Sequence, residues 1–313
     1  MEEFQIKTAG RICFFGDNAD LIEKPAIAAA ISAYLILDFK ARKDDKIILR
    51  SVDLDFEEEF QVGSNFSLEG PLKYIKAVIR NLSSHINSGF SMIIKSDIPI
   101  GAGMSSSTAL TIGAIRAIDR WKRLSMSLSD IAELSYTTES RDLGSECGRM
   151  DQYAISFGGI TYITTDENAT AEKLNHPQLN LIVADSEDTH DTADLQIWLR
   201  NRLDNREPLL MESLGRVVDI VEEGREAFKS QNLQQLGELM NRQQVEEKLM
   251  GTSTPRLDLM CSESLDSGAL GAKQMGAGGG GCIIALAESD KVSVIKGSLE
   301  RMGCPVWKFN IIE

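Results

Sequence analysis

Apolar residues recur along this chain in two patterns, which predict strands in some segments and helices in others. Short apolar runs of strand length occur at residues 11–15, 34–39, 46–52, 59–62, 91–96, 179–184, 282–286 and 307–311. Apolar positions at helical spacing predict helices at residues 71–85, 109–118, 127–141, 210–221 and 233–240. Because strands and helices are mixed in both halves of the chain, the pattern favours an α+β fold over a doubly wound sheet.

The polar stretch 166–177 separates these elements into two groups and contains few apolar residues. Such composition is typical of a linker, so we expect two domains, at residues 1–170 and 171–313. The length of 313 residues leaves each domain enough material for a hydrophobic core.

The chain is acidic, with 33 Lys and Arg residues against 47 Asp and Glu residues and a net charge of −14. This charge argues against a nucleic-acid or anionic-membrane partner, so local dipoles and a cation would have to attract any anionic ligand. Five scattered cysteines disfavour a zinc site, and the longest apolar run, 26–37, is too short to span a bilayer. The scattered cysteines and the first residues, which do not resemble a signal peptide, favour the cytoplasm. The sequence leaves the choice between a monomer and a homodimer open.

Glycines and serines lie between a predicted strand and a predicted helix, at 99–108. The first amides of a helix have no partner within it and favour an anion, and glycine lets backbone approach a ligand closely. The segment predicts a phosphate-binding turn, although it lacks the ending of a Walker A loop, and a flexible turn with helix-capping serines is the alternative. The residues assigned to phosphate binding are Pro99, Gly101, Ala102, Gly103, Met104, Ser105, Ser106 and Ser107.

Two further groups lie later in the chain. Five glycines within 276–281 predict backbone packed against a ligand or another loop, and we expect them to face the first turn. Glu139 and Asp151 lie at the end of one predicted helix and the start of the next, so the chain can bring both carboxylates together. Phosphoryl transfer needs one group to ligate magnesium and one to accept a proton, although isolated carboxylates are usually solvated surface groups.

A fourth group follows the first predicted strand. Arg11 lies in that strand, and short polar side chains follow at Asp17, Asn18 and Asp20. Such side chains suit the hydroxyls of a sugar, and arginine suits a nearby carboxylate or phosphate. The alternative is an Asx-rich turn with Arg11 paired at the surface.

These four groups, in this order, resemble the motifs of the GHMP kinases, the superfamily of galactokinase, homoserine kinase, mevalonate kinase and phosphomevalonate kinase. Segments 99–109 and 271–282 are similar to the second and third motifs of the superfamily. The resemblance implies ATP and Mg²⁺ as cofactors. It also implies an N-terminal domain with a left-handed βαβ unit and a ferredoxin-like C-terminal domain, with the ligands in the cleft between them.

The residues nearest the chemistry look like those of galactokinase. Arg11 beside Asp151, which is followed by Gln152, is similar to its catalytic arrangement, and Glu139 falls where galactokinases carry a magnesium ligand. The resemblance therefore implies that Asp151 acts as the base with Arg11 beside it. Glu139 and Ser106 would ligate magnesium, with Ser107 as the alternative serine.

The acceptor suggested by the same resemblance is a sugar, and the hydroxyl expected to be phosphorylated is the anomeric one. Asp17, Asn18 and Asp20 align with the Glu-His-x-Asp by which galactokinases hold galactose, and only the last residue is kept. These departures put galactose itself in doubt. The backbone at Gly278 and Gly279 is assigned to the same acceptor.

Two alternatives stay open. Segments 24–31, 251–255 and 268–273 look more like mevalonate kinase or heptose kinases, but two carboxylates near the acceptor would repel the carboxylate of mevalonate. Mevalonate kinases also usually carry Lys at the position of Arg11. The alternative of another class is a non-catalytic, sugar-sensing regulator, which the completeness of the site disfavours.

Overall fold

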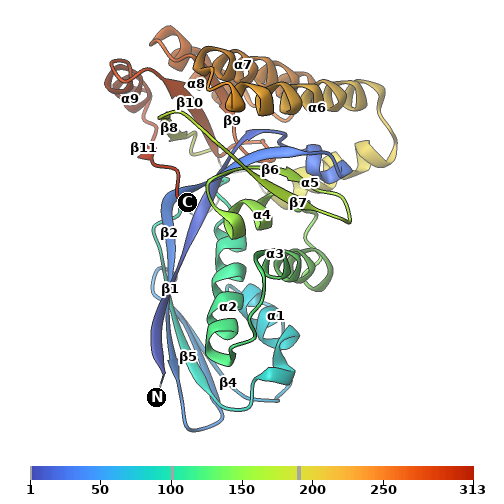
Figure 1. The fold of residues 1–313 in the computed structure, drawn as a ribbon, viewed down its shortest axis with the longest axis vertical. Helices are drawn as coiled ribbons and strands as arrows, with labels where there is room; N and C mark the ends of the chain where they lie inside the picture. The colour runs from blue at the N-terminus through green and yellow to red at the C-terminus, as the bar shows by residue number, and fades with distance from the viewer. Residues whose placement is uncertain (1, 100–101, 189–191) are drawn as a thin grey trace.

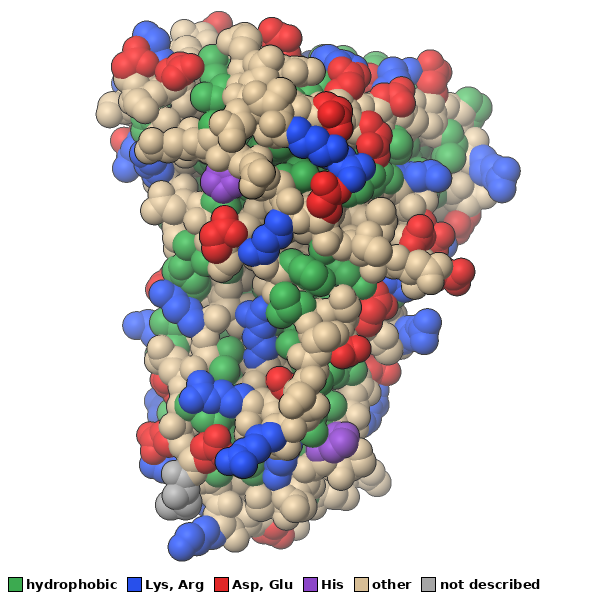
Figure 2. Space-filling model, viewed as in Figure 1, with side chains coloured by type: hydrophobic (Ala, Val, Ile, Leu, Met, Phe, Trp, Pro, Cys, Tyr) green, Lys and Arg blue, Asp and Glu red, His purple; other side chains and the backbone are tan. Residues whose placement is uncertain are grey.

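The computed structural model describes residues 2–99, 102–188 and 192–313, which form two lobes, each built on its own sheet (Figure 1). Within these ranges no helix is both long and apolar enough to cross a bilayer. Acidic and basic side chains are interspersed on both lobes of the face shown in Figure 2.

A seven-stranded sheet forms the N-terminal lobe. Its strands are β1 (Glu3–Phe15), β2 (Ala26–Ala41), β3 (Lys46–Ser51), β4 (Phe56–Gln61), β5 (Phe90–Ser96), β6 (Ile160–Thr164) and β7 (Thr170–Leu174). The order is β4-β3-β5-β2-β6-β7, and β1 pairs with β2 along nearly its whole length. Strands β3 and β5 run parallel, and a parallel pair needs a crossover. The left hand expected for that crossover stays a prediction.

Helices cover one face of this sheet (Figure 1). They are α1 (Lys73–Asn81), α2 (Ser106–Lys122), α3 (Leu128–Thr137) and α4 (Met150–Phe157), with short helical turns at η1 (Ala19–Ile22), η2 (Ser83–His85) and η3 (Thr138–Asp142). Helices α2 and α4 pack directly on β1 and β2. Because α2 is apolar on most of its surface, ten of its residues are buried, and it forms the centre of the N-terminal core.

The C-terminal lobe contains a four-stranded antiparallel sheet in the order β11-β8-β10-β9. Its elements are β8 (Asn180–Asp185), α5 (Thr192–Asp204), α6 (Pro208–Lys229), α7 (Leu233–Met250), α8 (Pro255–Asp266), β9 (Gly271–Gln274), β10 (Cys282–Ala287), α9 (Val292–Arg301) and β11 (Val306–Phe309). Helices lie between the first and second strands and between the third and fourth. This βαββαβ sequence is the ferredoxin-like arrangement that we expected.

Apolar contacts join the two lobes. Phe14, at the end of β1, meets Phe228 of α6 edge to face with ring centroids 5.2 Å apart, and both side chains are fully buried. The end of β1 therefore belongs to the core of both lobes.

The prediction of a linker at 166–177 is wrong over part of that segment. Residues Thr170–Leu174 form β7, which pairs with β6 and completes the N-terminal sheet. Only Leu174 of this edge strand is buried, so the segment lacks the apolar alternation by which strands are recognised. The chain passes from the N-terminal sheet to the C-terminal sheet between Leu174 and Asn180. The domain division at 170 and 171 stays a prediction.

A glycine contact lets α7 lie directly on β9. A Cβ atom placed on Gly237 would come within 2.5 Å of the Leu270 carbonyl, and one on Gly271 would overlap the carbonyl oxygen of Gly237. Neither position has room for a side chain, so the close approach of helix and strand requires glycine at both.

We predict that Gly237→Ala lowers the free energy of unfolding by about 2 kcal/mol, because the overlap with Leu270 outweighs the better helix propensity of alanine. Gly215→Ala on α6 is the matched control, since a Cβ there meets nothing within 4 Å. The control should be neutral or stabilising by up to about 1 kcal/mol in urea unfolding. A similar response of both variants would contradict this packing argument.

Candidate active site

A cleft of about 540 Å³ lies between the lobes. Its N-terminal wall contains Arg11 from β1, the segment after β5, the turn η3 and the start of α4. Gly276 and Ala277 line it from the C-terminal lobe. Residues from distant parts of the chain therefore meet here.

The turn before α2 has the geometry of an anion site. Ser105 adopts a left-handed conformation with φ 57°, and its hydroxyl donates to Asp151. It makes no capping hydrogen bond to α2 within the described chain, which leaves the first amides of this helix without a side-chain cap. Such amides carry the positive end of the helix dipole and favour an anion.

The structure brings most of the predicted phosphate-binding residues together. The cleft is lined by Pro99, Gly103, Met104, Ser105, Ser106 and Ser107. Ala102 is buried beneath the turn, and Gly101 lies outside the described residues.

Arg11 and Asp151 form a two-pronged ion pair on the floor of the cleft. Arg11 Nε lies 2.6 Å from Asp151 Oδ1, and Nη2 lies 2.9 Å from Oδ2. The Nη1 group donates to the carbonyl of Gly103. The arginine side chain is 6% exposed and that of the aspartate 25% exposed, so a buried cation orients a carboxylate that still faces the cleft.

Glu139 lies on a π-helical turn that follows α3 and is almost fully buried. It accepts hydrogen bonds from Thr108 at 3.0 Å, Ser135 at 3.1 Å and Gln152 at 3.3 Å. Burial raises the pKa of Glu139 to about 7, with a further upward contribution from the charge of Asp151 and an opposing one from the Thr108 hydrogen bond.

This surrounding fits a magnesium ion. Among the described residues no basic side chain pairs with Glu139, and Gln152 Oε1 is buried without a hydrogen-bond partner. Carboxylate, amide and hydroxyl oxygens are the ligands that Mg²⁺ prefers, and Ser106 lines the same cleft.

Asp17 and Asn18 are buried and are not among the residues that line the cleft, and their assignment to the acceptor stays a prediction. Asp17 is fully buried and lies 2.5 Å from Lys273 Nζ. Asn18 is 5% exposed and turns its amide toward Glu247 and the carbonyl of Ala277. Short polar side chains after a strand are equally typical of ligand contacts and of buried networks, and the local sequence does not distinguish them.

The glycine cluster is split between two surroundings. A Cβ on Gly276 would lie 3.7 Å from the Gly103 carbonyl, so this end faces the first turn as predicted. Gly279 instead donates to the Thr252 carbonyl at 2.7 Å, and a Cβ on Gly278 would overlap the same carbonyl. Both Gly278 and Gly279 therefore pack on the loop at Thr252, and their assignment to the acceptor stays a prediction.

Asp20 lines a pocket of about 330 Å³ that adjoins the cleft through shared residues at 144–147. Burial, with a smaller contribution from the charge of Asp151, raises the pKa of Asp20 to about 7. Two cations, Arg149 and Arg200, line the same pocket. Arg149 is held by Glu133 at 2.9 Å and by the ring of Tyr136. Of the predicted acceptor residues, Asp20 alone lies beside the cleft.

Sequence reasoning missed Lys73, Tyr74, Arg149 and Arg200. Lys73 and Tyr74 come from the first turn of α1 and line the cleft, and Lys73 has no acidic partner among the described residues. A basic residue at the start of an amphipathic helix was the available signal. It carries no information about which loop the helix start will face.

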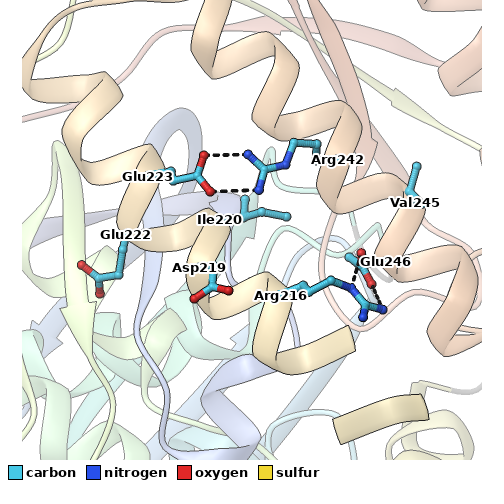
Figure 3. A pocket seen from close by; sticks show the side chains of 8 residues that line it. All are labelled: Arg216, Asp219, Ile220, Glu222, Glu223, Arg242, Val245 and Glu246. Atoms are coloured by element: carbon cyan, nitrogen blue, oxygen red, sulfur yellow. Dashed lines mark hydrogen bonds and ion pairs between the residues drawn. The ribbon is translucent and has the colours of Figure 1, made fainter. Parts of the chain in front are cut away.

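A second hollow, of about 520 Å³, lies between α6 and α7 (Figure 3). Both of its arginines are paired, since Arg216 contacts Glu246 at 2.8 Å and Arg242 contacts Glu223 at 2.6 Å. These pairs bridge the two helices. We therefore interpret the hollow as a solvent-exposed contact between α6 and α7.

Family models agree with the geometry of the cleft. The model described as GHMP kinases N terminal domain matches residues 73–159, and the model described as GHMP kinases C terminal matches residues 225–303. This chain belongs to the GHMP kinases. It is therefore a phosphotransferase with an alcohol group as acceptor, of a family that uses ATP, typically with Mg²⁺.

Relatives and solved structures match this chain over most of its length. The chain is 30% identical to the mevalonate kinase of Pyrococcus abyssi over 88% of this chain and 86% of that protein, and 30% identical to that of Methanothermobacter thermautotrophicus over 87% and 86%. The Methanococcus jannaschii mevalonate kinase structure aligns with a TM-score of 0.87 at 25% identity, covering 100% and 99%. Lactococcus lactis galactokinase complexed with galactose aligns with a TM-score of 0.84 at 23% identity, covering 100% and 93%, which shows the fold alone.

We predict that Glu139→Gln reduces the pH dependence of stability in the metal-free protein. The folded-state pKa of about 7 lies above the ordinary value of 4.5, so the stability present at pH 4.5 is lost as pH rises through 7. The loss amounts to about 3 kcal/mol and should be absent from the variant.

Urea unfolding at pH 5 and pH 8 measures this difference. Asp20 and Glu247 also have raised pKa values, but they titrate in both proteins and cancel in the comparison. Saturating Mg²⁺ should reduce the loss in the wild type, because a bound cation stabilises the ionised carboxylate. Identical pH profiles for the two proteins would remove Glu139 from this role.

Proposed function

We propose that this kinase transfers the γ-phosphoryl group of ATP to a hydroxyl of a small hydroxy acid, with mevalonate as the first candidate. The observation that carries the kinase chemistry is the Arg11–Asp151 pair, which lies beside the uncapped start of α2 in one cleft. Together these provide an oriented carboxylate and a phosphate site within reach of each other.

The nucleotide end of the cleft is assigned to the first turn of α2. Its amides and the hydroxyls of Ser106 and Ser107 would hold the phosphates, and Lys73 is the nearby cation without an acidic partner in the described chain. Glu139 and Ser106 would hold Mg²⁺, which supplies charge neutralisation on the phosphates when bound.

Asp151 is assigned to the acceptor hydroxyl. Its carboxylate is fixed by Arg11 and by the Ser105 hydroxyl, and its exposed fraction faces the cleft. In this position it would accept the hydrogen of the attacking hydroxyl and orient that oxygen toward the phosphates. Arg11 disperses the negative charge that builds up, and positioning and electrostatics supply most of the catalysis.

The acidic acceptor is supported by relatives and by charge. Mevalonate kinases about 30% identical to this chain match it over most of their length. The expected repulsion of a carboxylate is weakened, because Asp17 is paired with Lys273 and the pKa of Asp20 is raised to about 7. Arg149 and Arg200 line the adjoining pocket, where they pair with Glu133 and Asp204, and an acidic acceptor would share these cations.

A sugar is the second candidate acceptor. Arg11 in place of the lysine usual in mevalonate kinases, and Gln152 after Asp151, are galactokinase-like features, and a protonated Asp20 can donate to a sugar hydroxyl. On this reading the anomeric hydroxyl is phosphorylated. A sugar-sensing regulator without turnover is disfavoured, because Asp151 and Glu139 both line the cleft.

We expect mevalonate to give a kcat/KM at least about a hundredfold above that of any sugar tested, because a site that pairs a substrate charge discriminates strongly. The panel contains mevalonate, galactose, arabinose, fucose, glucuronic acid and a heptose 7-phosphate, each with ATP and Mg²⁺ and with product identified by mass spectrometry. Turnover of a sugar alone would favour the second candidate. Failure of every acceptor, with ATP bound, would contradict both.

We predict that Asp151→Asn lowers kcat by at least about a hundredfold while ATP binding stays nearly unchanged, because the variant keeps the shape of the side chain but loses its basicity. Steady-state kinetics and nucleotide titration separate the two effects. Asp219→Asn, in the hollow between α6 and α7, is the matched control and should leave both unchanged. Retained turnover in Asp151→Asn would exclude this residue from the mechanism.

A further inference from the structure

A fully buried ion pair joins the two lobes beneath the cleft. Asp17 follows β1 in the N-terminal lobe, and Lys273 lies in β9 of the C-terminal lobe. Their side chains are 0% exposed, and Lys273 Nζ lies 2.5 Å from Asp17 Oδ2. Buried charges are costly unless they are paired and hydrogen-bonded, so each of the two residues depends on the other.

The pair is attached to the glycine-rich segment that lines the cleft. Asp17 Oδ1 accepts a hydrogen bond from the amide of Gly276 at 2.6 Å, and Lys273 Nζ also donates to the carbonyl of Gln274 at 2.5 Å. These two contacts hold the chain just before and at the start of the glycine cluster. Gly276 in turn faces the carbonyl of Gly103 in the phosphate-binding turn.

Helix α7 fixes the pair from a third direction. Gln243 donates to Asp17 Oδ2 at 2.9 Å and to Glu247 at 3.1 Å, while its own side-chain oxygen accepts from the amide of Gly16 at 3.1 Å. Glu247 also accepts from Thr252 at 2.6 Å. The contacts come from separate elements and reach both oxygens of Asp17, whose side chain is 0% exposed, so an acceptor hydroxyl would contact it only if the surrounding segments moved.

We infer that Asp17 and Lys273 are a positioning pair, which sets the segment 276–277 against the phosphate-binding turn and so shapes the nucleotide end of the cleft. The inference rests on the proposed nucleotide site. It gives Asp17 a role opposite to that of a sugar ligand, because its loss acts on ATP and leaves the acceptor contacts in place.

The test uses Asp17→Asn, Lys273→Met and the double variant. Each single variant should raise the Kd for MgATP, measured by titration without acceptor, at least about tenfold, because small displacements of positioning groups are costly. The KM of the acceptor should change by less than about threefold. The double variant should be no worse than the poorer single variant, because both substitutions break one interaction.

Lys76→Met is the matched control for loss of a buried lysine. Lys76 is 2% exposed and pairs with Glu58 at 3.0 Å, and neither residue lines the cleft. This variant should lower the melting temperature without changing the Kd for MgATP. A single variant of the positioning pair that does not fold leaves the double variant as the test, since neither member of the pair is then left as a buried charge without its partner.

Three outcomes would overturn the inference. A higher acceptor KM with an unchanged Kd for MgATP in Asp17→Asn would make Asp17 an acceptor ligand. A lower melting temperature with unchanged Kd in every folded variant, as in Lys76→Met, would make the pair purely structural. If the wild type itself does not bind MgATP, the proposed function falls and this inference with it.

Discussion

The buried guanidinium of Arg11 is the interaction on which the cleft depends. Its three nitrogens contact both oxygens of Asp151 and the carbonyl of Gly103. One side chain of β1 thus fixes the carboxylate on α4 and the turn before α2. Because an unpaired buried cation is strongly destabilising, these partners cannot be removed independently. The chemistry and the stability of the N-terminal lobe therefore rely on the same contacts.

The sequence predicts the parts of this arrangement that depend on local order. The turn before α2, the π-helical Glu139 and the start of α4 are recognised because each is a short motif next to a periodic segment. Motif order then assigns them to one site. The edge strand β7 is missed because Leu174 is its only buried residue, so no alternation marks it.

Long-range pairing lies beyond such reasoning. Asp17 and Lys273 are 256 residues apart, and nothing near either residue identifies its partner. A count of carboxylates near the acceptor consequently overstates repulsion, because Asp17 is already neutralised in the folded chain. Likewise, the net charge of −14 overstates the acidity of the cleft, where Arg11 and Lys73 lie beside Glu139, Glu146 and Asp151. The local balance of charge governs which ligand a site accepts.

Strand β1 connects the two ion pairs. It carries Arg11 in its paired part, and the turn after it carries Asp17, while its last residues pack on α6 in the C-terminal lobe. Because β1 is paired with β2 almost throughout, a shift of the strand would disturb the catalytic carboxylate and the glycine-rich segment together. Selection for a new acceptor is therefore expected to act on residues outside these pairs. Asp20, Arg149 and Arg200 line the adjoining pocket and meet that condition.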